Sequence, residues 1–246
     1  MESKYKRIIL KISGEALVDE SNHEVLDGKK IESIAKTLKL LHDNNVEVGV
    51  VVGAGNIFRG KLSDELNIDR TDADYMGMLG TVINCVAISS CLEKMGIETR
   101  VMSAIQVNQI CEPYRYKKAR AHLARHIIVF FAGGTGNPYF TTDSCASLRA
   151  LEMNCDAILM GKNGIDGVYD SDPKINKNAK FIKNLTYDDI IRLNLKVMDQ
   201  TSIAMLKDHG IEVRIFSMKD PNNFLKVVKG EDIGSTIKEK QYVRNL

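Results

Sequence analysis

Short runs of β-branched residues alternate along this chain with longer segments in which apolar residues recur every three or four positions. The short runs predict strands, and strands that alternate with helices are typical of βα units around a parallel sheet. The predicted strands are residues 7–12, 46–52, 98–102, 127–131, 157–160 and 212–216. We therefore expect an α/β fold, a three-layer αβα sandwich with a mostly parallel central sheet.

The longer segments predict the helices of the outer layers. Apolar positions three or four residues apart make residues 29–43 an amphipathic helix. A longer helix is predicted over residues 72–95, and Gly96 stands just past its end, where glycine commonly terminates a helix. The remaining predicted helices are residues 142–153, 188–193, 202–209 and 221–229.

Length and composition narrow the class of protein. The chain of 246 residues is expected to form one domain, residues 1–246. Its 44% hydrophobic and 27% charged residues are ordinary for a globular protein, and no stretch approaches the apolar length of a membrane span. The opening MESKYKRIILKIS lacks the apolar core and cleavage site of a secretory signal. We expect a cytoplasmic protein with no membrane partner.

Charge and cysteine usage argue against nucleic-acid binding, a disulfide framework and a zinc knuckle. A net charge of +2, from 34 basic and 32 acidic residues, gives no electrostatic reason to expect nucleic-acid binding. The five cysteines are far apart, odd in number and without a CxxC pair, which disfavours a disulfide framework and a zinc knuckle. We expect them to be buried thiols.

The informative feature is where the glycines lie. Four predicted strands run directly into glycine-containing loops: KISGEA (11–16), GAGNIFRG (53–60), AGGTGNPYFTTD (132–143) and GKNGIDGVYDSDP (161–173). Any one of them alone is more simply a tight turn. In an open parallel sheet, however, all four meet at the carboxyl edge, where backbone N–H groups can approach phosphate oxygens. Together with Lys11, Arg59 and Lys162 they predict a polyphosphate site.

The common nucleotide fingerprints are absent from the sequence. There is no G-x-x-x-x-G-K-[ST], and the G-x-G-x-x-G spacing that starts at Gly53 fails at Phe58. Phosphoryl transfer still fits, because positioned cations supply most of its catalysis. Lys11 and Lys162 are the candidate cations.

Several segments carry a family resemblance. KISGEAL, VVVGAGNIFRG, DADYMGMLGTVIN, MSAIQVNQICE, GGTGNPYFTTD, KNGIDGVYDSDP, LKVMD and GSTI occur in this order between residues 5 and 237. This set resembles the bacterial-type uridylate kinases of the amino acid kinase superfamily. The resemblance implies the amino acid kinase fold and transfer of a phosphoryl group from ATP to UMP in pyrimidine nucleotide biosynthesis.

For the donor side, the resemblance implies an ATP site built from two loops. It assigns transition-state stabilisation to Lys11 and places Arg59 between the two nucleotides. Asp143 organises the lysines or Mg²⁺, and Lys162 is the fourth catalytic residue. The implied ATP-binding residues are Lys11, Ile12, Ser13, Gly14, Gly55, Arg59, Asn163, Tyr169 and Asp172.

For the acceptor side, the resemblance implies that Ala54 and Gly55 bind the UMP phosphate and that Asp74 holds the ribose. The wall of the uridine pocket consists of Thr135, Gly136, Asn137, Pro138, Tyr139, Phe140, Thr141 and Thr142. Thr142 or Asp143 is expected to cap the following helix and to point its positive end at the acceptor. The acceptor part then covers roughly residues 1–150 and the donor part roughly 151–237, with a frayed tail at 238–246.

The resemblance also implies partners. Mg²⁺ would bridge the ATP phosphates with few protein ligands. UTP is expected to inhibit through the acceptor pocket, and the relatives imply a homo-oligomer, specifically a homohexamer. Two departures stand out: Ala54 replaces a glycine and requires a negative φ, and the carboxylates of the loop 19–25 oppose activation by GTP.

Simpler interpretations exist for single residues. Asp74 can cap a helix, Tyr169 can be a core aromatic, and Asp172 before a proline is a common turn former. His122 and His126 are four residues apart, but we expect a solvated helix face there and no metal site. Two other functions stay open: a carboxylate or carbamate kinase of the same superfamily, and a nucleotide-binding regulator or storage protein without turnover.

Overall fold

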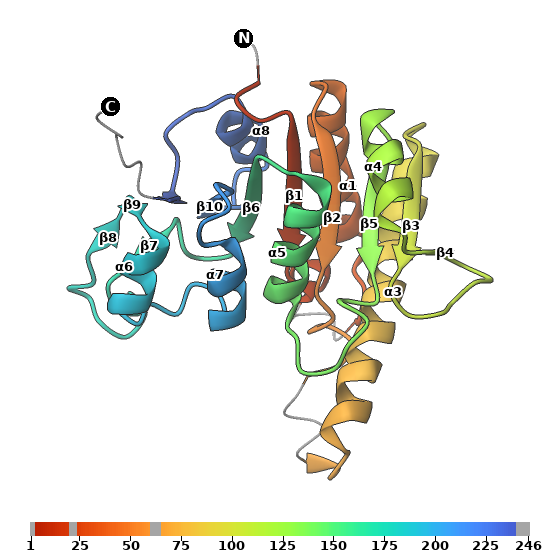
Figure 1. Ribbon diagram of the computed structural model, residues 1–246, viewed down its shortest axis with the longest axis horizontal. Coiled ribbons are helices and arrows are strands. Elements are labelled where there is room, and N and C mark those ends of the chain that lie inside the picture. The colour runs from red at the N-terminus through yellow and green to blue at the C-terminus, as the bar shows by residue number, and fades with distance from the viewer. Residues whose placement is uncertain (1–2, 20–23, 60–64, 240–246) are drawn as a thin grey trace.

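The computed structural model describes residues 3–19, 24–59 and 65–239, and its centre is one mixed sheet (Figure 1). The strands are β1 (Arg7–Ile12), β2 (Glu47–Val52), β3 (Thr99–Ser103), β4 (Glu112–Pro113), β5 (Ile128–Ala132), β6 (Ala157–Lys162), β9 (Asn184–Leu185), β10 (Glu212–Ser217) and β11 (Ser235–Ile237). Their spatial order is β4-β3-β5-β2-β1-β6-β10-β11-β9. Only the β10–β11 pair is antiparallel among these strands. The prediction of a mostly parallel sheet is confirmed.

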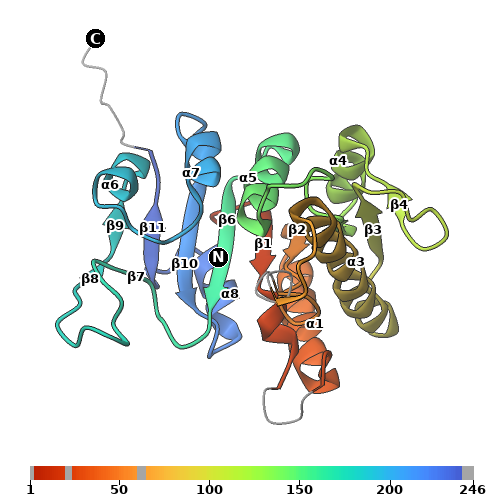
Figure 2. The ribbon, with the colours of Figure 1, turned by 90° about the horizontal axis from the view of Figure 1, so that it is seen from below.

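Helices cover both faces of the sheet, as Figure 2 shows from below. One face carries α1 (Gly28–Asp43), α3 (Arg70–Lys94) and α8 (Asn222–Val228), and the other carries α4 (Tyr116–Ala124), α5 (Thr142–Met153), α6 (Tyr187–Arg192) and α7 (Gln200–Leu206). The three-layer αβα architecture is therefore confirmed. A short 3₁₀ turn, η1 (Gly14–Leu17), follows β1.

The two cores follow from the alternation of side chains along each strand. In β1, Ile8 and Leu10 pack under α1, α3 and α8, whereas Ile9 packs with α4, α5 and α7 on the opposite face. Because successive side chains of a strand point to opposite faces, a strand covered on both sides is apolar throughout. All six residues of β2 are buried for this reason.

The six predicted strands and six predicted helices all exist, with ends that differ by at most three residues. The shortest strands were not predicted, and neither was α4 as an element. The expectation of a solvated His122 is wrong: its ring is buried, with Nε2 3.5 Å from Glu112 Oε2. His126 lies beyond the end of α4 and has a positive φ, so the two histidines do not share a helix face. Of the five free cysteines, four are buried and Cys91 is partly buried.

Helix α3 contradicts the expectation that no stretch approaches the apolar length of a membrane span. By length and composition it could cross a membrane, with a mean hydropathy of 1.5 in its most apolar window. Half of that window is buried inside the protein, where Val82, Cys85, Ile88 and Leu92 belong to the core. A core helix passes the same test, and the packing of α3 on the sheet is that of a core helix.

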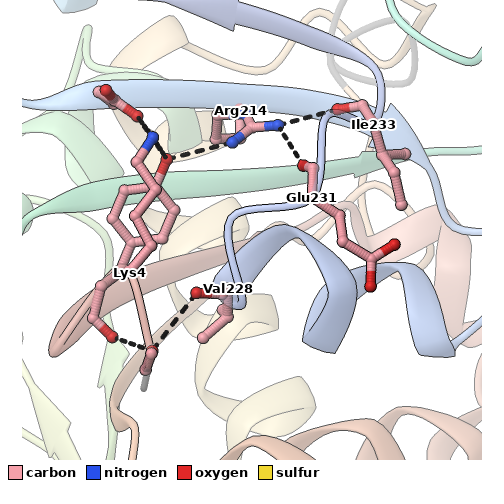
Figure 3. Close-up of polar contacts among 8 residues, drawn as sticks. Lys4, Arg214, Val228, Glu231 and Ile233 are labelled. Carbon is pink, nitrogen blue, oxygen red and sulfur yellow. Dashed lines mark hydrogen bonds and ion pairs between the residues drawn. The ribbon is translucent and has the colours of Figure 1, made fainter. Parts of the chain in front are cut away.

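A polar network fastens the amino-terminal edge of the sheet (Figure 3). We call Lys4, Tyr5, Glu212 and Arg214 the edge cluster. Lys4 Nζ donates to both Tyr5 Oη and Glu212 Oε2 at 2.8 Å, and Tyr5 also donates to Glu212. The buried Arg214 donates to Tyr5 Oη at 3.2 Å and to the carbonyls of Glu231 and Ile233 at 3.3 and 3.0 Å. These contacts tie the start of the chain to β10 and to the segment before β11.

Candidate active site

The loops after β1 and β2 meet the start of α5 at the carboxyl edge of the sheet, which faces the viewer in Figure 2. A Cβ atom on Gly14 would lie 2.4 Å from Asn56 Oδ1 and 2.7 Å from the Gly53 carbonyl, so only glycine allows this approach. Gly53 in turn lies against Thr142, whose Oγ1 would be 3.3 Å from an added Cβ. The backbones of the two loops therefore pack closely together beside the start of α5.

A buried asparagine fixes the loop after β2. Asn84 of α3 donates from Nδ2 to the Gly53 carbonyl at 2.7 Å and exchanges hydrogen bonds with Asn56 at 2.8 and 2.9 Å. A buried amide of this kind must find partners, so it holds the loop in one conformation. The sequence alone gave no reason to choose Asn84, because it lies mid-helix among apolar residues.

Two lysines and one carboxylate form the charged centre of this edge. Lys11 Nζ lies 2.9 Å from Asp143 Oδ1, and Lys162 ends β6, the strand that pairs with β1. Burial lowers the pKa of Lys162, the positive charge of Lys11 lowers it further, and Asp143 opposes both effects. We call Lys11, Asp143 and Lys162 the central cluster. Its surplus of positive charge suits a polyphosphate.

Thr141 and Asp199 set the start of α5. Thr141 Oγ1 accepts from the backbone N–H groups of Asp143 and Ser144 at 3.1 and 3.2 Å. The N-cap is therefore Thr141, and the prediction of Thr142 or Asp143 is wrong, because those two residues already have helical geometry. Asp199, the N-cap of α7, accepts from the hydroxyls of Thr141 and Ser144. Burial works to raise the pKa of Asp199, but these hydrogen bonds and those from Ser202 lower it overall.

A cavity of about 500 Å³ lies on one side of the central cluster. Of the residues predicted for the acceptor, seven line it: Ala54, Gly55, Asp74, Thr135, Phe140, Thr141 and Thr142. Gly136, Asn137, Pro138 and Tyr139 belong to the same loop but do not line it. Sequence reasoning missed the contributions of Phe58, Ile68, Arg70, Met78 and Thr81. We call this space the acceptor cavity.

Asp74 joins α3 to the loop that walls the acceptor cavity. Its carboxylate accepts from Arg70 Nε at 3.0 Å and from the backbone N–H of Tyr139 at 2.8 Å. Tyr139 has a φ of 70°, a left-handed conformation that is uncommon for an aromatic residue. The N-cap of α3 is Asp69, so Asp74 does not have the capping role that its position permitted.

Arg59 lies at the mouth between the first two loops. Its Nε donates to the Gly55 carbonyl at 2.9 Å, and Nη2 lies 3.4 Å from Glu15 Oε1 of η1. The side chain is mostly exposed, so its guanidinium can reach a ligand at either loop. Ser13 and Gly14 belong to the same edge, whereas Ile12 is a buried core residue that contributes only backbone there.

A second cavity of about 500 Å³ lies on the other side of the sheet's midpoint and reaches Lys162. It is lined by residues 167–174, which include β7 (Val168–Tyr169), and by residues 194–197. Strand β8 (Phe181–Ile182) pairs with β7 but does not line the cavity. Tyr169 stacks edge-on with Phe181, and Asp172 begins a turn by accepting from Lys174 N at 2.9 Å. Tyr169 and Asp172 both line this second cavity, which we call the donor cavity, whereas Asn163 is exposed and does not line it. Residues 194–197 were missed because the motif LKVMD carried no assigned role.

Metal binding by the protein itself finds little support. Among the described residues, no group of three or more His, Cys, Asp or Glu side chains could hold a metal ion. Asp143 is the carboxylate that the central cluster offers. Such a site fits an ion that is carried mainly by phosphate oxygens.

Residues 6–217 match the model of the amino acid kinase family. The chain belongs to the amino acid kinase family. It is 47% identical, over 95% of its own length and 97% of the other's, to a uridylate kinase of Limosilactobacillus reuteri (strain DSM 20016). A UMP kinase structure from Bacillus anthracis superimposes with a TM-score of 0.93 at 41% identity, covering 96% of this chain and 97% of that one. A UMP kinase structure from Ureaplasma parvum gives 0.90 at 38% identity, covering 96% and 100%.

Within this amino acid kinase, the departure at Ala54 is accommodated. Ala54 does not take a positive φ, and its methyl group packs against Gly80 of α3, where an added Cβ would approach within 2.9 Å. The second departure, the loop 19–25, lies partly outside the described residues, and the expectation about GTP stays a prediction.

Proposed function

We propose that the protein is a UMP kinase that transfers the terminal phosphoryl group of ATP to the phosphate of UMP and releases UDP and ADP. The observation that carries this proposal is the central cluster between two cavities of about 500 Å³. The acceptor cavity reaches the cluster at Thr142, beside Asp143, and the donor cavity reaches it at Lys162. The uridylate kinases at 47–48% identity supply the nucleotide class of the acceptor.

Charge placement explains how the residues would act. In phosphoryl transfer, an oxygen of the UMP phosphate attacks the γ-phosphorus in line while the bond to the ADP oxygen breaks, and negative charge spreads over the transferred oxygens. Lys11 and Lys162 place ammonium groups where that charge develops, and Asp143 keeps them together. The positive end of α5 and the guanidinium of Arg59 add to the same field.

Mg²⁺ belongs to the proposal as an ion bound chiefly to ATP. When bound, it would neutralise phosphate charge and hold the donor oxygens in a fixed geometry. Asp143 is the residue that could reach it from the central cluster, and the donor phosphates would lie against Ser13 and Gly14. The residues of the chain bind and orient the two nucleotides and exclude water from the space between them.

An assay of acceptor choice tests the function. Mg-ATP is offered with UMP, CMP, aspartate or acetylglutamate, and ADP release is followed by a coupled reaction. We expect turnover with UMP and poor turnover with CMP, because exchanging a ring donor for an acceptor leaves buried polar groups unpaired at about 1–3 kcal/mol each. Turnover of a carboxylate with UMP inert would refute the proposal.

The two alternatives are not favoured. A carboxylate kinase shares the donor-side residues, but the similarity to a uridylate kinase covers 95% of the chain and so includes the acceptor side. A regulator without turnover would have no need of the lysines and the carboxylate of the central cluster. UTP inhibition is part of the proposal: if UTP occupies the acceptor cavity, raising UMP should relieve the inhibition.

The proposal includes assembly into a homohexamer. One face of α3 exposes Tyr75, Met76, Leu79 and Ile83, a patch that a second copy could cover in a homohexamer. A monomer in light scattering at micromolar concentration would refute the assembly.

The acceptor part covers roughly residues 1–150 and the donor part roughly 151–237 of one domain, and we place the enzyme in the cytoplasm with its nucleotide substrates.

A further inference from the structure

A buried arginine lies behind the wall of the acceptor cavity without lining it. Arg149 belongs to the second turn of α5, and only 3% of its surface is exposed. Its Nη1 donates to Glu152 Oε2 at 2.5 Å, and its guanidinium carbon lies 3.8 Å from the centre of the Tyr114 ring. A buried charge is unfavourable unless it is paired, so these contacts indicate why the arginine can be accommodated.

The other arm of the guanidinium reaches the acceptor loop. Arg149 Nη2 donates to the carbonyl of Gly134 at 3.2 Å. Gly134 has a φ of 59° and lies at the root of the loop 133–141, next to Gly133, whose N–H donates to Thr81 Oγ1 at 2.9 Å. Gly134 lines the acceptor cavity, as do Thr135 and Phe140 further along the loop. One side chain therefore ties the inner part of α5 to the first turn of the cavity wall.

Tyr114 connects the same network to the floor of the cavity. Its hydroxyl donates to Glu152 Oε2 at 2.5 Å, and its ring packs edge-on against Phe131 with 5.8 Å between centroids. Phe131 lines the acceptor cavity. The Arg149 guanidinium therefore lies between Tyr114, which packs on the cavity-lining Phe131, and Gly134, where the cavity wall begins.

We propose that Arg149 is a positioning residue for the acceptor nucleotide, which it never touches, and that it acts by holding the Gly134 carbonyl. This inference rests on the proposed function and names a determinant of acceptor affinity within it. Displacing Gly134 would move the wall that follows it, whereas the donor cavity has no contact with this network among the described residues. The effect should fall on the acceptor alone.

The chemistry of arginine explains why this position needs it. A planar guanidinium can donate to Glu152 and to Gly134 in two directions while its face lies on Tyr114. A lysine keeps the charge but concentrates it at one ammonium group. In Arg149→Lys, the ion pair with Glu152 can persist while the bond to Gly134 is lost.

The test compares Arg149→Lys with Glu152→Gln. The second substitution also disturbs the ion pair, but it keeps an acceptor for Arg149 and leaves the Gly134 contact in place. Initial rates give KM for UMP, KM for ATP and kcat, and calorimetry gives the UMP dissociation constant independently of turnover. Melting curves record stability for both variants.

We expect Arg149→Lys to raise KM and Kd for UMP roughly tenfold, the effect of one lost hydrogen bond to a buried carbonyl, with KM for ATP unchanged. Glu152→Gln should leave both UMP constants within about twofold of the wild type while it lowers the melting temperature. That pattern separates positioning from stability.

Equal rises in KM for UMP in both variants would assign the effect to the ion pair and overturn the proposal. Failure of Arg149→Lys to fold while Glu152→Gln folds, or a lower melting temperature with unchanged UMP constants, would make Arg149 purely structural and would also overturn it. Absence of UMP turnover in the wild type would refute the proposed function instead.

Discussion

The central cluster and the edge cluster contain the same charges but differ in how those charges are satisfied. Each holds two cations and one carboxylate, at opposite ends of the strands around β1. In the edge cluster, Lys4 and Arg214 both have acceptors, which include the Tyr5 hydroxyl and two backbone carbonyls (Figure 3). In the central cluster, Lys162 Nζ donates to no acceptor in the described ranges, although burial has removed much of its water.

The pKa shifts of the two lysines express this difference. Burial works to lower the pKa of Lys4, but its hydrogen bonds to Glu212 and Tyr5 outweigh burial and raise it. Burial lowers the pKa of Lys162, and Lys11 adds to the effect. A satisfied charge stabilises the fold, whereas an unsatisfied one is better placed to bind an anion and to stabilise charge as it develops. We therefore assign stability to the edge cluster and catalysis to the central cluster.

Removing Lys11 should have the largest effect on catalysis and little effect on stability. We expect Lys11→Met to lower kcat roughly a hundredfold to a thousandfold, because one preorganised cationic donor is lost, while melting and UMP binding change little. The matched control is Lys4→Met, the same substitution in the edge cluster, which should leave kcat unchanged. Steady-state rates and melting curves of both variants decide. A Lys11→Met enzyme with nearly full turnover would contradict the assignment.

Neutralising Asp143 tests the assignment of catalysis to the central cluster through the pH dependence of kcat. Asp143 raises the pKa of Lys162 against the two effects that lower it, so its loss lowers that pKa further. In the proposed mechanism Lys162 acts as an ammonium group, so the alkaline limb of the kcat profile should move to lower pH in Asp143→Asn. We also expect kcat at neutral pH to fall roughly tenfold, as for one lost charge-assisted interaction. An unmoved alkaline limb would exclude Lys162 as the titrating group.

In the edge cluster, Tyr5→Phe should affect stability alone. The hydroxyl bridges Lys4, Glu212 and Arg214, so its removal leaves the buried Arg214 and the partly buried Glu212 with fewer partners, at a cost of about 1–3 kcal/mol in the free energy of unfolding. Denaturant unfolding measures the loss, and kcat should stay within experimental error. A fall in kcat without loss of stability would show that the two ends of the sheet are coupled.

The smallest expected effect is the acid dependence of stability. Burial works to raise the pKa of Glu212, but hydrogen bonds from Lys4 and Tyr5 lower it overall. A lowered carboxyl pKa contributes stability above its ordinary value of 4.5, and this contribution is lost as the pH falls through the native value. Glu212→Gln should therefore show a shallower decline in unfolding free energy below about pH 5. An unchanged slope would show that Glu212 titrates alike in both states.

Most of the fold could be predicted because its signals are local. The strand 7–12 and the helix 142–153 match β1 and α5 at both ends, since β-branched runs and helical periodicity are visible within a few residues. The strands β4, β7, β8 and β9 have two residues each and owe their existence to neighbours far along the chain. Propensity cannot reveal pairing of that kind.

The same limit applies to the site. Lys11 and Lys162 stood out because they are cations in glycine-containing loops that follow predicted strands, and Asp143 because the resemblance to uridylate kinases assigns it a role. Asn84 and Arg149 gave no such signal, because each lies within a helix and its contact with a distant backbone carbonyl, of Gly53 and Gly134 respectively, is visible only in the structure. The cap of α5 was predicted one or two residues too late, at Thr142 or Asp143, because Thr141, Thr142 and Asp143 can all cap a helix and the sequence does not choose among them.

Transfer of the labelled γ-phosphoryl group of ATP in a single turnover tests the central claim most directly. With enzyme in excess over Mg-ATP and UMP saturating, rapid quenching follows the label for the wild type and for Lys162→Met. We predict that the wild type places the label on UMP and that Lys162→Met slows this step roughly a hundredfold or more without weakening UMP binding. Transfer at the wild-type rate in Lys162→Met, or no label on UMP in the wild type, would contradict the account.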